Sequence, residues 1–577
     1  MSARRPPPAP LAWLVLAAAV ALGWRLGGGR LLDPDEGRNA EVAREMAQSN
    51  DYLLPHLDGL PYLDKPVVYF AAAAAAMEVL GPNETAARLP AYLATLATLA
   101  LVAWFARRRW GADAGRLAAL ALATMPMPLA YARTAIFDST LSLCTTAAIL
   151  CFFEERPVLA WAAMGAGALT KGPVALLIPL AAVVPWALLT GSGGAALRRI
   201  FDWRGLLAFA AVALPWFVAV ATRIPAFPQY VFVRETWERF MTPSFHRGGP
   251  WWYFLPILPI AAFPWIVPAL AGLKHWRWGW LARRENPHAR EAVFLTCWVL
   301  APLAFFSFNH SKLPQYVLPL MPALALAAAR AYAREGMRFA WRASVVCAVA
   351  LGLALVSLTG WMPAPIALTP AERAAIPPAA LLLGLALLVA AGLVAVGVRR
   401  GHKTLVAAAY GLAVASIPFA GAPLLDAVGE DRSAFALAAA LRDKGVVVGV
   451  GAYPPSLPFY LRRPMYVATE TGRELTSTFI ADYVERLRYQ EGSPLLSGAV
   501  WATLRDTCAQ PTVFVFRAGD RDRRATMTGL PLLYEDGRYA AYGPCLTPLG
   551  PPSPRRGEGA GPTPRSPSPR SGEGARG

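Results

Sequence analysis

Acidic and basic side chains are concentrated in one polar stretch, residues 33–66, which lies between two long apolar segments. A simple connector between membrane helices does not require such a set of carboxylates, guanidiniums and amines. We therefore interpret this stretch as the front of a catalytic site at a membrane surface. Its reactive side chains are Asp33, Asp35, Glu36, Arg38, Glu41, Arg44, Glu45, Asp51, His56, Asp58, Asp64 and Lys65.

The tetrapeptide Asp33-Pro34-Asp35-Glu36 predicts the first turn of a helix. Asp33 suits the N-cap, Pro34 suits the first helical position, and Glu36 completes a capping box. Asp35 is not needed for the cap, so its carboxylate can orient or deprotonate an acceptor hydroxyl or phosphate. We assign Asp33 and Glu36 to helix initiation and Asp35 to catalysis.

Lys65 directly precedes the apolar run 67–80, which places its ammonium at the depth of lipid headgroups. Such a lysine is either a snorkelling side chain or a ligand for the phosphate of an anionic lipid. The neighbouring Asp64 could hold a divalent metal together with His246, because imidazole and carboxylate ligands suit zinc.

Further ionisable residues interrupt apolar segments on the same inferred side of the membrane. Unpaired burial of such groups is unfavourable, so each is a functional candidate, although each could also be an anchor or part of a structural ion pair. Arg133 with Asp138 is the pair that best fits a structural role. Together they predict a positively biased pocket with few carboxylates, formed by Arg88, Arg133, Asp138, Lys171, His246, Lys312 and Tyr316.

Long apolar segments must position these residues. Of the 577 residues, 56% are hydrophobic and only 16% are charged. Apolar runs long enough to cross a bilayer recur from Leu11 to Ala422, and we expect about thirteen spans. The run 66–80 is too short to cross and is expected to lie at the interface or partly in the bundle. The fold class is therefore mainly α, polytopic and membrane-embedded.

The net charge of +18 does not indicate a nucleic-acid partner, because the basic residues cluster in short loops between spans. Their alternation predicts a cytoplasmic N-terminus and an odd number of spans, which places the loop 31–85 and the C-terminal region outside. The connection 154–156 fits this pattern poorly, because it should be cytoplasmic and is not basic.

Composition becomes globular near residue 423, which predicts domains at 1–422 and 423–548 and a disordered tail at 549–577. The C-terminal domain is expected to be a small α/β domain with a helix over 433–444. Cys508 and Cys545 could pair if this domain faces an oxidising compartment. Strands are predicted at 446–450, 465–468, 512–517 and 538–542.

Two other classes of protein fit parts of this pattern. A transporter or lipid flippase would also have many spans and ionisable residues, but here the polar groups gather at one face instead of the midplane. A membrane-anchored binding protein acting through residues 423–548 would leave the chemistry of the loop unexplained.

Several segments resemble the ArnT-like and protein-mannosyltransferase-like (PMT) membrane glycosyltransferases. The resemblance covers about the first 420 residues and continues into the C-terminal domain at AFALAAALRDKG and GAYPPSLPFYLRRPMYV. It implies a GT-C fold and inverting transfer of a sugar from a polyprenyl-phosphate carrier at the outer face of the bacterial inner membrane. The other segments are PDEGRNAEVAREM, PHLDGLPYLDKPVVYF, ETAARLPA, LTKGP, HRGGPWWYFLPIL and SKLPQYVLPLMPALAL.

In ArnT the sugar is 4-amino-4-deoxy-L-arabinose and the acceptor is a lipid A phosphate. The resemblance leaves open another pentose or hexose, another envelope acceptor and a protein O-mannosyltransferase activity. It implies that Asp35 is the essential aspartate, that Lys65 binds the carrier phosphate, and that Asp64 and His246 form the metal pair. Asp64 replaces the glutamate usual in ArnT. The remaining cavity positions are Arg38, Arg88, Asp138, Lys171, Lys312 and Tyr316.

Overall fold

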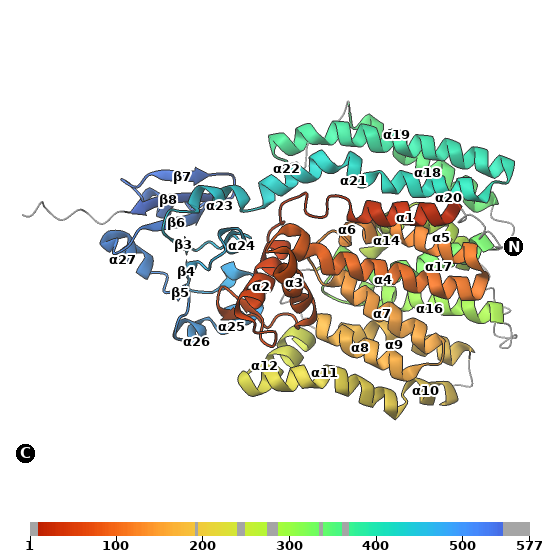
Figure 1. The fold of residues 1–577 in the computed structure, drawn as a ribbon, viewed down its shortest axis with the longest axis horizontal. Helices are drawn as coiled ribbons and strands as arrows, with labels where there is room; N and C mark the ends of the chain where they lie inside the picture. The colour runs from red at the N-terminus through yellow and green to blue at the C-terminus, as the bar shows by residue number, and fades with distance from the viewer. Residues whose placement is uncertain are drawn as a thin grey trace, which may run out of the picture.

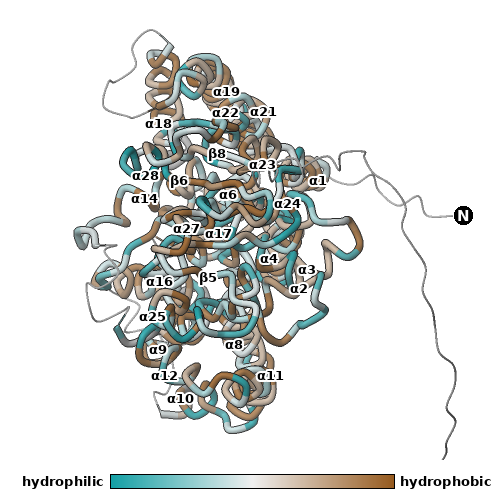
Figure 2. The backbone as a smooth tube through the Cα atoms, turned by 90° about the vertical axis from the view of Figure 1, so that its left-hand side faces the viewer, coloured by the Kyte–Doolittle hydropathy of each residue, from teal (hydrophilic) through white to brown (hydrophobic). Residues whose placement is uncertain are grey.

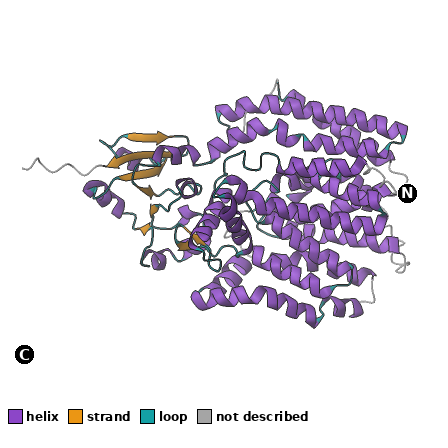
Figure 3. Ribbon diagram, viewed as in Figure 1, coloured by secondary structure: helices purple, strands orange, loops and turns teal. Residues whose placement is uncertain are grey.

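Apolar helices lie side by side in one bundle, and the polar loop and a smaller C-terminal domain sit at one end of it (Figure 1). This computed structural model describes residues 10–190, 194–238, 248–273, 287–333, 338–359 and 368–545. Strands gather at that same end, beside the helical bundle (Figure 3). The predicted tail 549–577 lies outside the described residues.

Six helical segments in the described residues are long and apolar enough to cross a membrane. They are Glu84–Trp110, Leu197–Arg223, Arg290–Phe308, Pro314–Ala333, Pro370–Arg400 and Lys403–Ala420. Shorter apolar helices accompany them, and the predicted total of about thirteen spans stays a prediction. The long bundle helices are α1 (Pro10–Gly23), α4 (Glu84–Trp110), α5 (Ala112–Ala123), α7 (Asp138–Phe153), α8 (Pro157–Lys171), α9 (Val174–Thr190), α11 (Trp203–Arg223), α16 (Pro287–Phe308), α17 (Met321–Ala333), α18 (Arg338–Ser357), α19 (Pro370–Arg400) and α20 (Lys403–Ala415).

Short helical segments connect the long helices. A π-helix covers Tyr230–Glu238 and a 3₁₀-helix covers Pro314–Leu320. Proline begins several of these segments, as expected from its fixed φ and missing N–H. The short helices are α6 (Pro126–Tyr131), α10 (Gly194–Ile200), α12 (Phe227–Gln229), α14 (Phe254–Ala261), α15 (Ile266–Leu273), α21 (Ile417–Ala420) and α22 (Ala422–Arg432).

The polar stretch forms helix α2 (Asp35–Ser49) and a hairpin of β1 (His56–Leu57) and β2 (Leu60–Pro61), and helix α3 (Val68–Leu80) follows it. The short apolar run after Lys65 is therefore a helix of 13 residues, which packs against α2 and α4. Figure 2 views the molecule from the end where this loop and the C-terminal domain lie.

The predicted capping box at the start of α2 is wrong. Pro34 precedes the helix and no side chain caps it. The Asp33 carboxylate instead accepts hydrogen bonds from Ser456 Oγ (3.0 Å) and Arg538 Nη2 (3.5 Å), and its burial raises its pKa to about 7. Contacts with the C-terminal domain thus replace the local cap.

The C-terminal domain contains a mixed six-stranded sheet with the order β5-β4-β3-β6-β8-β7. β3 runs parallel to β4 and β6, whereas β8 is antiparallel to β6 and β7. The predicted strands 446–450 and 512–517 match β3 and β6. The strands are β3 (Val446–Val450), β4 (Tyr466–Ala468), β5 (Leu495–Leu496), β6 (Thr512–Arg517), β7 (Leu532–Glu535) and β8 (Tyr539–Cys545).

Helices of the C-terminal domain are short and fill the connections between strands. The predicted helix 433–444 corresponds to α23 (Phe435–Leu441). The other helices are α24 (Leu457–Leu461), a 3₁₀ turn (Arg473–Leu475), α25 (Thr478–Asp482), α26 (Val484–Arg488), α27 (Val500–Thr507) and α28 (Arg521–Ala525).

One hydrophobic core joins the polar loop to the C-terminal domain. Leu57 and Phe70 of the loop belong to the same buried cluster as Val447 and Phe479 of the domain. The domain is therefore packed onto the loop and is not a separate appendage.

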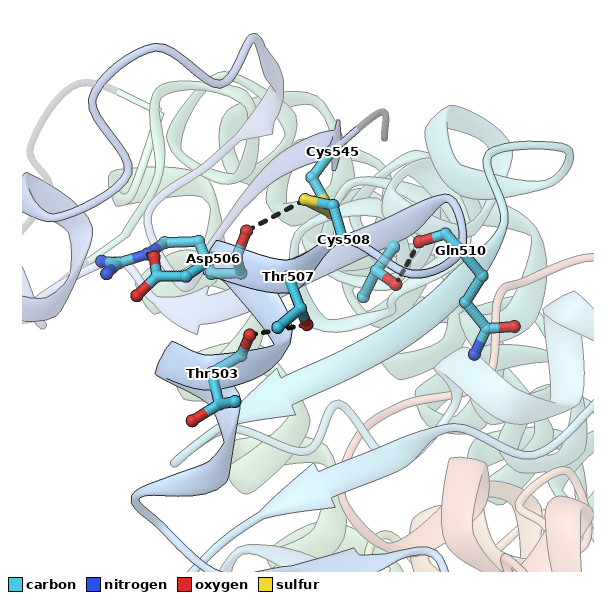
Figure 4. The surroundings of a disulfide bond; sticks show 8 residues. Thr503, Asp506, Thr507, Cys508, Gln510 and Cys545 are labelled. Carbon is cyan, nitrogen blue, oxygen red and sulfur yellow. Dashed lines mark hydrogen bonds and ion pairs between the residues drawn. A yellow bond between two sulfur atoms is a disulfide. The ribbon is translucent and has the colours of Figure 1, made fainter. Parts of the chain in front are cut away.

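Cys508 and Cys545 form a disulfide bond between the end of α27 and the end of β8 (Figure 4). The bond closes a loop with a sequence separation of 37 residues.

Replacing Cys545 with serine is expected to destabilise the C-terminal domain by up to about 4 kcal/mol, because the unfolded chain regains the entropy that the closed loop removes. Thermal unfolding of the purified protein, with and without reductant, measures this change. The Cys347→Ser variant is the matched control, because Cys347 is a free and exposed cysteine in the bundle. Equal melting temperatures for Cys545→Ser and the oxidised wild type would contradict the prediction.

Candidate active site

A cavity of about 90 Å³ lies where the polar loop meets the bundle. Most of its wall is apolar, from residues such as Leu141, Trp216 and Phe306. Polar side chains from five separate parts of the sequence also reach it. The predicted site residues that line it are Asp64, Lys65, Asp138, Lys171 and Tyr316. We call it the lysine cavity.

Lys171 ends helix α8, and its Nζ donates a hydrogen bond to Asp138 Oδ1 at 2.5 Å. The same ammonium lies over the rings of Phe137 (5.3 Å) and Tyr316 (5.4 Å). The predicted pairing of Arg133 with Asp138 is therefore wrong, because the α7–α8 contact brings Lys171 to this carboxylate first.

Lys65 reaches the same cavity from the end of the polar loop, just before α3. Its Nζ lies 3.4 Å from Glu235 Oε2 and 2.5 Å from the Asp64 carbonyl oxygen. Its side chain is only 14% exposed. Two ammonium groups, Lys65 and Lys171, therefore meet two carboxylates, Glu235 and Asp138, at the wall of one small cavity.

The Asp64 carboxylate is held by the C-terminal domain. Its Oδ1 accepts hydrogen bonds from Tyr230 Oη (2.5 Å), Ser477 Oγ (3.2 Å) and Phe479 N (3.0 Å), and its Oδ2 accepts one from Thr478 N (2.9 Å). These bonds dock the first turn of α25 onto the loop.

The described residues offer only one oxygen, Asp64 Oδ2, to the predicted zinc ion. Three hydrogen bonds occupy Asp64 Oδ1, so Oδ2 alone retains a lone pair for a metal. The second predicted ligand, His246, lies outside the described residues. One carboxylate oxygen does not make a metal site, and we derive no catalytic step through zinc.

Asp35 begins helix α2, and its side chain is 60% exposed. Its Oδ1 lies 2.5 Å from Arg38 Nη2, one helical turn away. Arg38 is buried, and its Nη1 donates to the carbonyl oxygen (3.2 Å) and Oγ1 (2.9 Å) of Thr476. The C-terminal domain therefore fixes the guanidinium that orients Asp35.

Two other predicted residues have mainly structural contacts. Arg88 forms a bidentate pair with Glu36, with Nε and Nη2 each 2.9 Å from a carboxylate oxygen. Lys312 is buried, and its Nζ donates to the Asn309 carbonyl oxygen. Ser311 and Tyr316 line the lysine cavity, whereas Lys312 is not among its lining residues.

A second cavity of about 390 Å³ lies beside the start of α2. The loop after α1, helix α6 and helices α21 and α22 enclose it. We call it the arginine cavity, because Arg25, Arg30, Arg88 and Arg133 line it. Glu36 also lines it, so α2 contributes to its wall next to Asp35.

Arg133 differs from the other three arginines. Arg25 pairs with Asp426 (3.0 Å), Arg30 with Glu430 (3.1 Å) and Arg88 with Glu36 (2.9 Å). Among the described residues, Arg133 has no carboxylate partner and makes long contacts with the carbonyl oxygens of Ala21 (3.3 Å) and Leu22 (3.5 Å). Burial, followed by repulsion from Arg88 and Arg25, lowers its pKa.

Helix α6 separates the two cavities. Leu129 and Ala130 face the arginine cavity, while the Tyr131 hydroxyl donates to Gln315 Oε1 (3.2 Å), which lines the lysine cavity. Asp35 lines neither of these two cavities; it begins α2, whose next residue, Glu36, lines the arginine cavity.

Sequence reasoning missed the partners that hold the site together. Glu235, Tyr230 and Gln315 contact the predicted residues, and Thr476 with the 477–479 turn binds Arg38 and Asp64. An acid at 235 in a hydrophobic connection was a usable signal. The turn carried none, because it joins the loop from more than 400 residues away.

Comparison with known proteins extends these observations. A family model described as dolichyl-phosphate-mannose-protein mannosyltransferase matches residues 64–218. A protein of Serratia proteamaculans named undecaprenyl phosphate-alpha-4-amino-4-deoxy-L-arabinose arabinosyl transferase is 34% identical over 346 residues, which are 56% of this chain and 59% of the relative. A protein of the same name from Yersinia enterocolitica is 34% identical over 319 residues, 53% of this chain and 56% of the relative. The matches thus span less than two thirds of these relatives.

Solved structures match over more of the chain. The crystal structure of ArnT from Cupriavidus metallidurans bound to undecaprenyl phosphate has a TM-score of 0.79 and 28% identity, and the match covers 94% of this chain and 100% of that chain. The apo structure gives a TM-score of 0.77 at 27% identity, with 92% and 97% covered. The shared fold therefore includes the bundle and the C-terminal domain.

Proposed function

We propose that this chain is a member of the ArnT-like and PMT-like group of GT-C membrane proteins and is a glycosyltransferase using a sugar carried on polyprenyl phosphate. The observation that carries the proposal is the lysine cavity, where Lys65 and Lys171 meet apolar walls at the end of the bundle. Ammonium groups suit a phosphate and the apolar walls suit the polyprenyl chain. The ArnT structure bound to undecaprenyl phosphate supports this assignment.

The proposed mechanism is a single displacement at the anomeric carbon. The new bond forms to an acceptor oxygen, and the bond to the carrier phosphate breaks with its electron pair passing to that phosphate. Lys65 and Lys171 stabilise the negative charge that develops on the leaving phosphate. Asp35 orients the acceptor or takes its proton, and Arg38 holds the Asp35 carboxylate in place.

The proposed acceptor is an anionic membrane lipid, such as lipid A. The arginine cavity supports this choice over a protein hydroxyl, because Arg133 has no carboxylate partner in the described part of the chain and its charge favours an anion. Apolar side chains such as Leu129, Ile417 and Leu425 offer contacts for acyl chains. Aminoarabinose is one candidate sugar, because the relatives are named as transferases of that sugar. Another pentose or hexose fits the cavity chemistry equally.

Arg133→Gln is expected to raise the KM for the acceptor by on the order of 10- to 100-fold, with little change in the KM for the donor. Losing charge-assisted hydrogen bonds to an anionic headgroup weakens binding by about 1.5–3 kcal/mol. Steady-state kinetics with each substrate varied in turn measures both constants. The exposed Arg442→Gln variant is the matched control. A raised donor KM with an unchanged acceptor KM would overturn the acceptor assignment.

The acceptor class can be tested in cells that carry or lack the gene. Mass spectrometry of lipid A, other envelope glycans and membrane proteins should show one added sugar on a phosphate-bearing lipid only where the protein is present. A sugar found on protein serine or threonine would support the activity named by the matching family model instead. No difference in any fraction would argue against glycosyl transfer.

We also propose that the protein resides in a bacterial inner membrane, with its N-terminus cytoplasmic and the loop 31–85 and C-terminal domain periplasmic. The basic connections between spans support this orientation. The disulfide between Cys508 and Cys545 supports an oxidising compartment for the C-terminal domain.

A further inference from the structure

Three carboxylates from helix α2 and the β1–β2 turn lie close together, outside the linings of both cavities. Glu41 and Glu45 lie one turn apart on α2, and Asp58 lies in the β1–β2 turn. One oxygen of each lies within 4.8 Å of the others. Glu41 and Asp58 are buried, whereas Glu45 is partly exposed and leaves a route for a small ion.

The charge of this cluster is not balanced by its own partners. Arg44 binds Glu41 with Nε at 2.7 Å and Nη2 at 2.6 Å. The Glu45 carboxylate accepts backbone N–H groups from Asp58 (2.5 Å) and Gly59 (2.9 Å). Three carboxylates and one guanidinium leave two excess negative charges.

Two buried polar atoms beside the cluster lack hydrogen-bond partners among the described residues. They are Asp58 Oδ2 and the hydroxyl of Tyr453, which is 3% exposed. Tyr453 comes from the C-terminal domain and interacts electrostatically with all three carboxylates. Buried polar groups in proteins are nearly always satisfied, so these two atoms are available to contact a ligand.

The donor set selects the kind of ligand. Every donor is an oxygen, which suits a hard cation and not zinc or copper. Each oxygen of Glu41 and Glu45 is used by a single hydrogen bond and keeps a lone pair. A set of protein oxygens favours calcium, which takes about 6–8 oxygen ligands in flexible geometry, whereas magnesium usually keeps several waters and is held by one or two carboxylates.

We propose that Glu41, Glu45 and Asp58, with the Tyr453 hydroxyl, hold a divalent cation, and that its size class is that of calcium. The cation neutralises the two excess charges and contacts three elements together: α2, the β1–β2 turn and the C-terminal domain.

This position gives the cation a structural role for the catalytic helix. Asp58 Oδ1 already accepts the Met465 N–H (3.0 Å), immediately before β4. Asp35 begins the same helix that carries Glu41 and Glu45. The cation thus fastens α2 to the C-terminal domain, whose Thr476 holds Arg38.

The test uses the purified full chain, stripped with a chelator and dialysed into metal-free buffer. Equilibrium dialysis with radioactive calcium is expected to show one bound ion per chain, and calcium is expected to raise the melting temperature. Asp58→Asn should lose both effects, while its amide oxygen can still accept the Met465 N–H. Asp51→Asn removes a loop carboxylate outside the cluster and should retain both effects.

Absence of stoichiometric calcium binding together with an unchanged melting temperature would overturn the proposal. A second result would also overturn it: a wild-type melting temperature that does not change with calcium but falls from pH 5 to pH 9. If Asp58→Asn lacks this fall, protons and not a cation occupy the cluster. Tighter binding of magnesium than of calcium would overturn the size assignment. These readouts do not depend on sugar transfer, so they can fail or succeed apart from the proposed activity.

Discussion

Asp35→Asn is expected to abolish sugar transfer, with a loss of about 10²- to 10⁴-fold in kcat, the range for a lost acid–base group. Asparagine keeps the shape of the side chain but cannot take a proton and binds Arg38 more weakly. The Asp35 side chain is 60% exposed, so losing its ion pair should change stability by only about 0–1 kcal/mol. Turnover at saturating substrate, with the amount of folded protein measured in parallel, tests the prediction.

Asp51→Asn provides the matched control, because Asp51 lies in the same loop and its carboxylate bonds locally to Leu53 and Leu54. It should keep near wild-type turnover. Full activity in Asp35→Asn would remove Asp35 from the mechanism, and equal losses in both variants would point to a folding defect of the loop.

Lys65→Met is expected to lower kcat/KM for the donor by about 10²- to 10³-fold, the effect of removing one group that stabilises developing charge. Lys65 lines the lysine cavity, and its ammonium lies beside Glu235. Initial rates at varied donor concentration, together with competition by free polyprenyl phosphate, measure the effect on carrier binding.

The double variant Lys65→Met, Glu235→Gln separates catalysis from stability. The single variant Lys65→Met removes the ammonium that lies beside the buried Glu235 carboxylate, whereas the double variant removes both charges. The double variant should recover thermal stability without recovering donor kinetics. Recovery of activity would show that Lys65 acts only by balancing Glu235. Lys444→Met, at an exposed position, should match wild type.

Local sequence patterns determined much of the secondary structure. The β-branched run 446–450 and the run 512–517 are both strands with the expected bounds, because buried strands need little beyond an apolar, β-branched segment. The capping box failed for the opposite reason. Asp33 and Glu36 have the right local spacing, but Ser456 and Arg88 compete for their carboxylates through tertiary contacts.

The sequence predicted which residues belong to the candidate site better than it predicted which of them form ion pairs. Lys65, Asp138 and Lys171 were identified as charges at span ends, and all three line one cavity. Their partners follow from helix packing, which periodicity does not reveal, so Asp138 was assigned to Arg133 when it pairs with Lys171. The part played by the C-terminal domain, through Thr476 and the turn after it, depends on contacts over 400 residues.

Sugar transfer by the purified protein is the most direct test of the proposed function. The protein is incubated with a radiolabelled sugar on polyprenyl phosphate and with either a phosphate-bearing lipid or a serine-rich peptide, and labelled products are separated. We expect label on the lipid with wild type and none with Asp35→Asn. Label that stays on the carrier, or crosses a vesicle membrane without changing its attachment, would contradict a glycosyltransferase and favour a transporter.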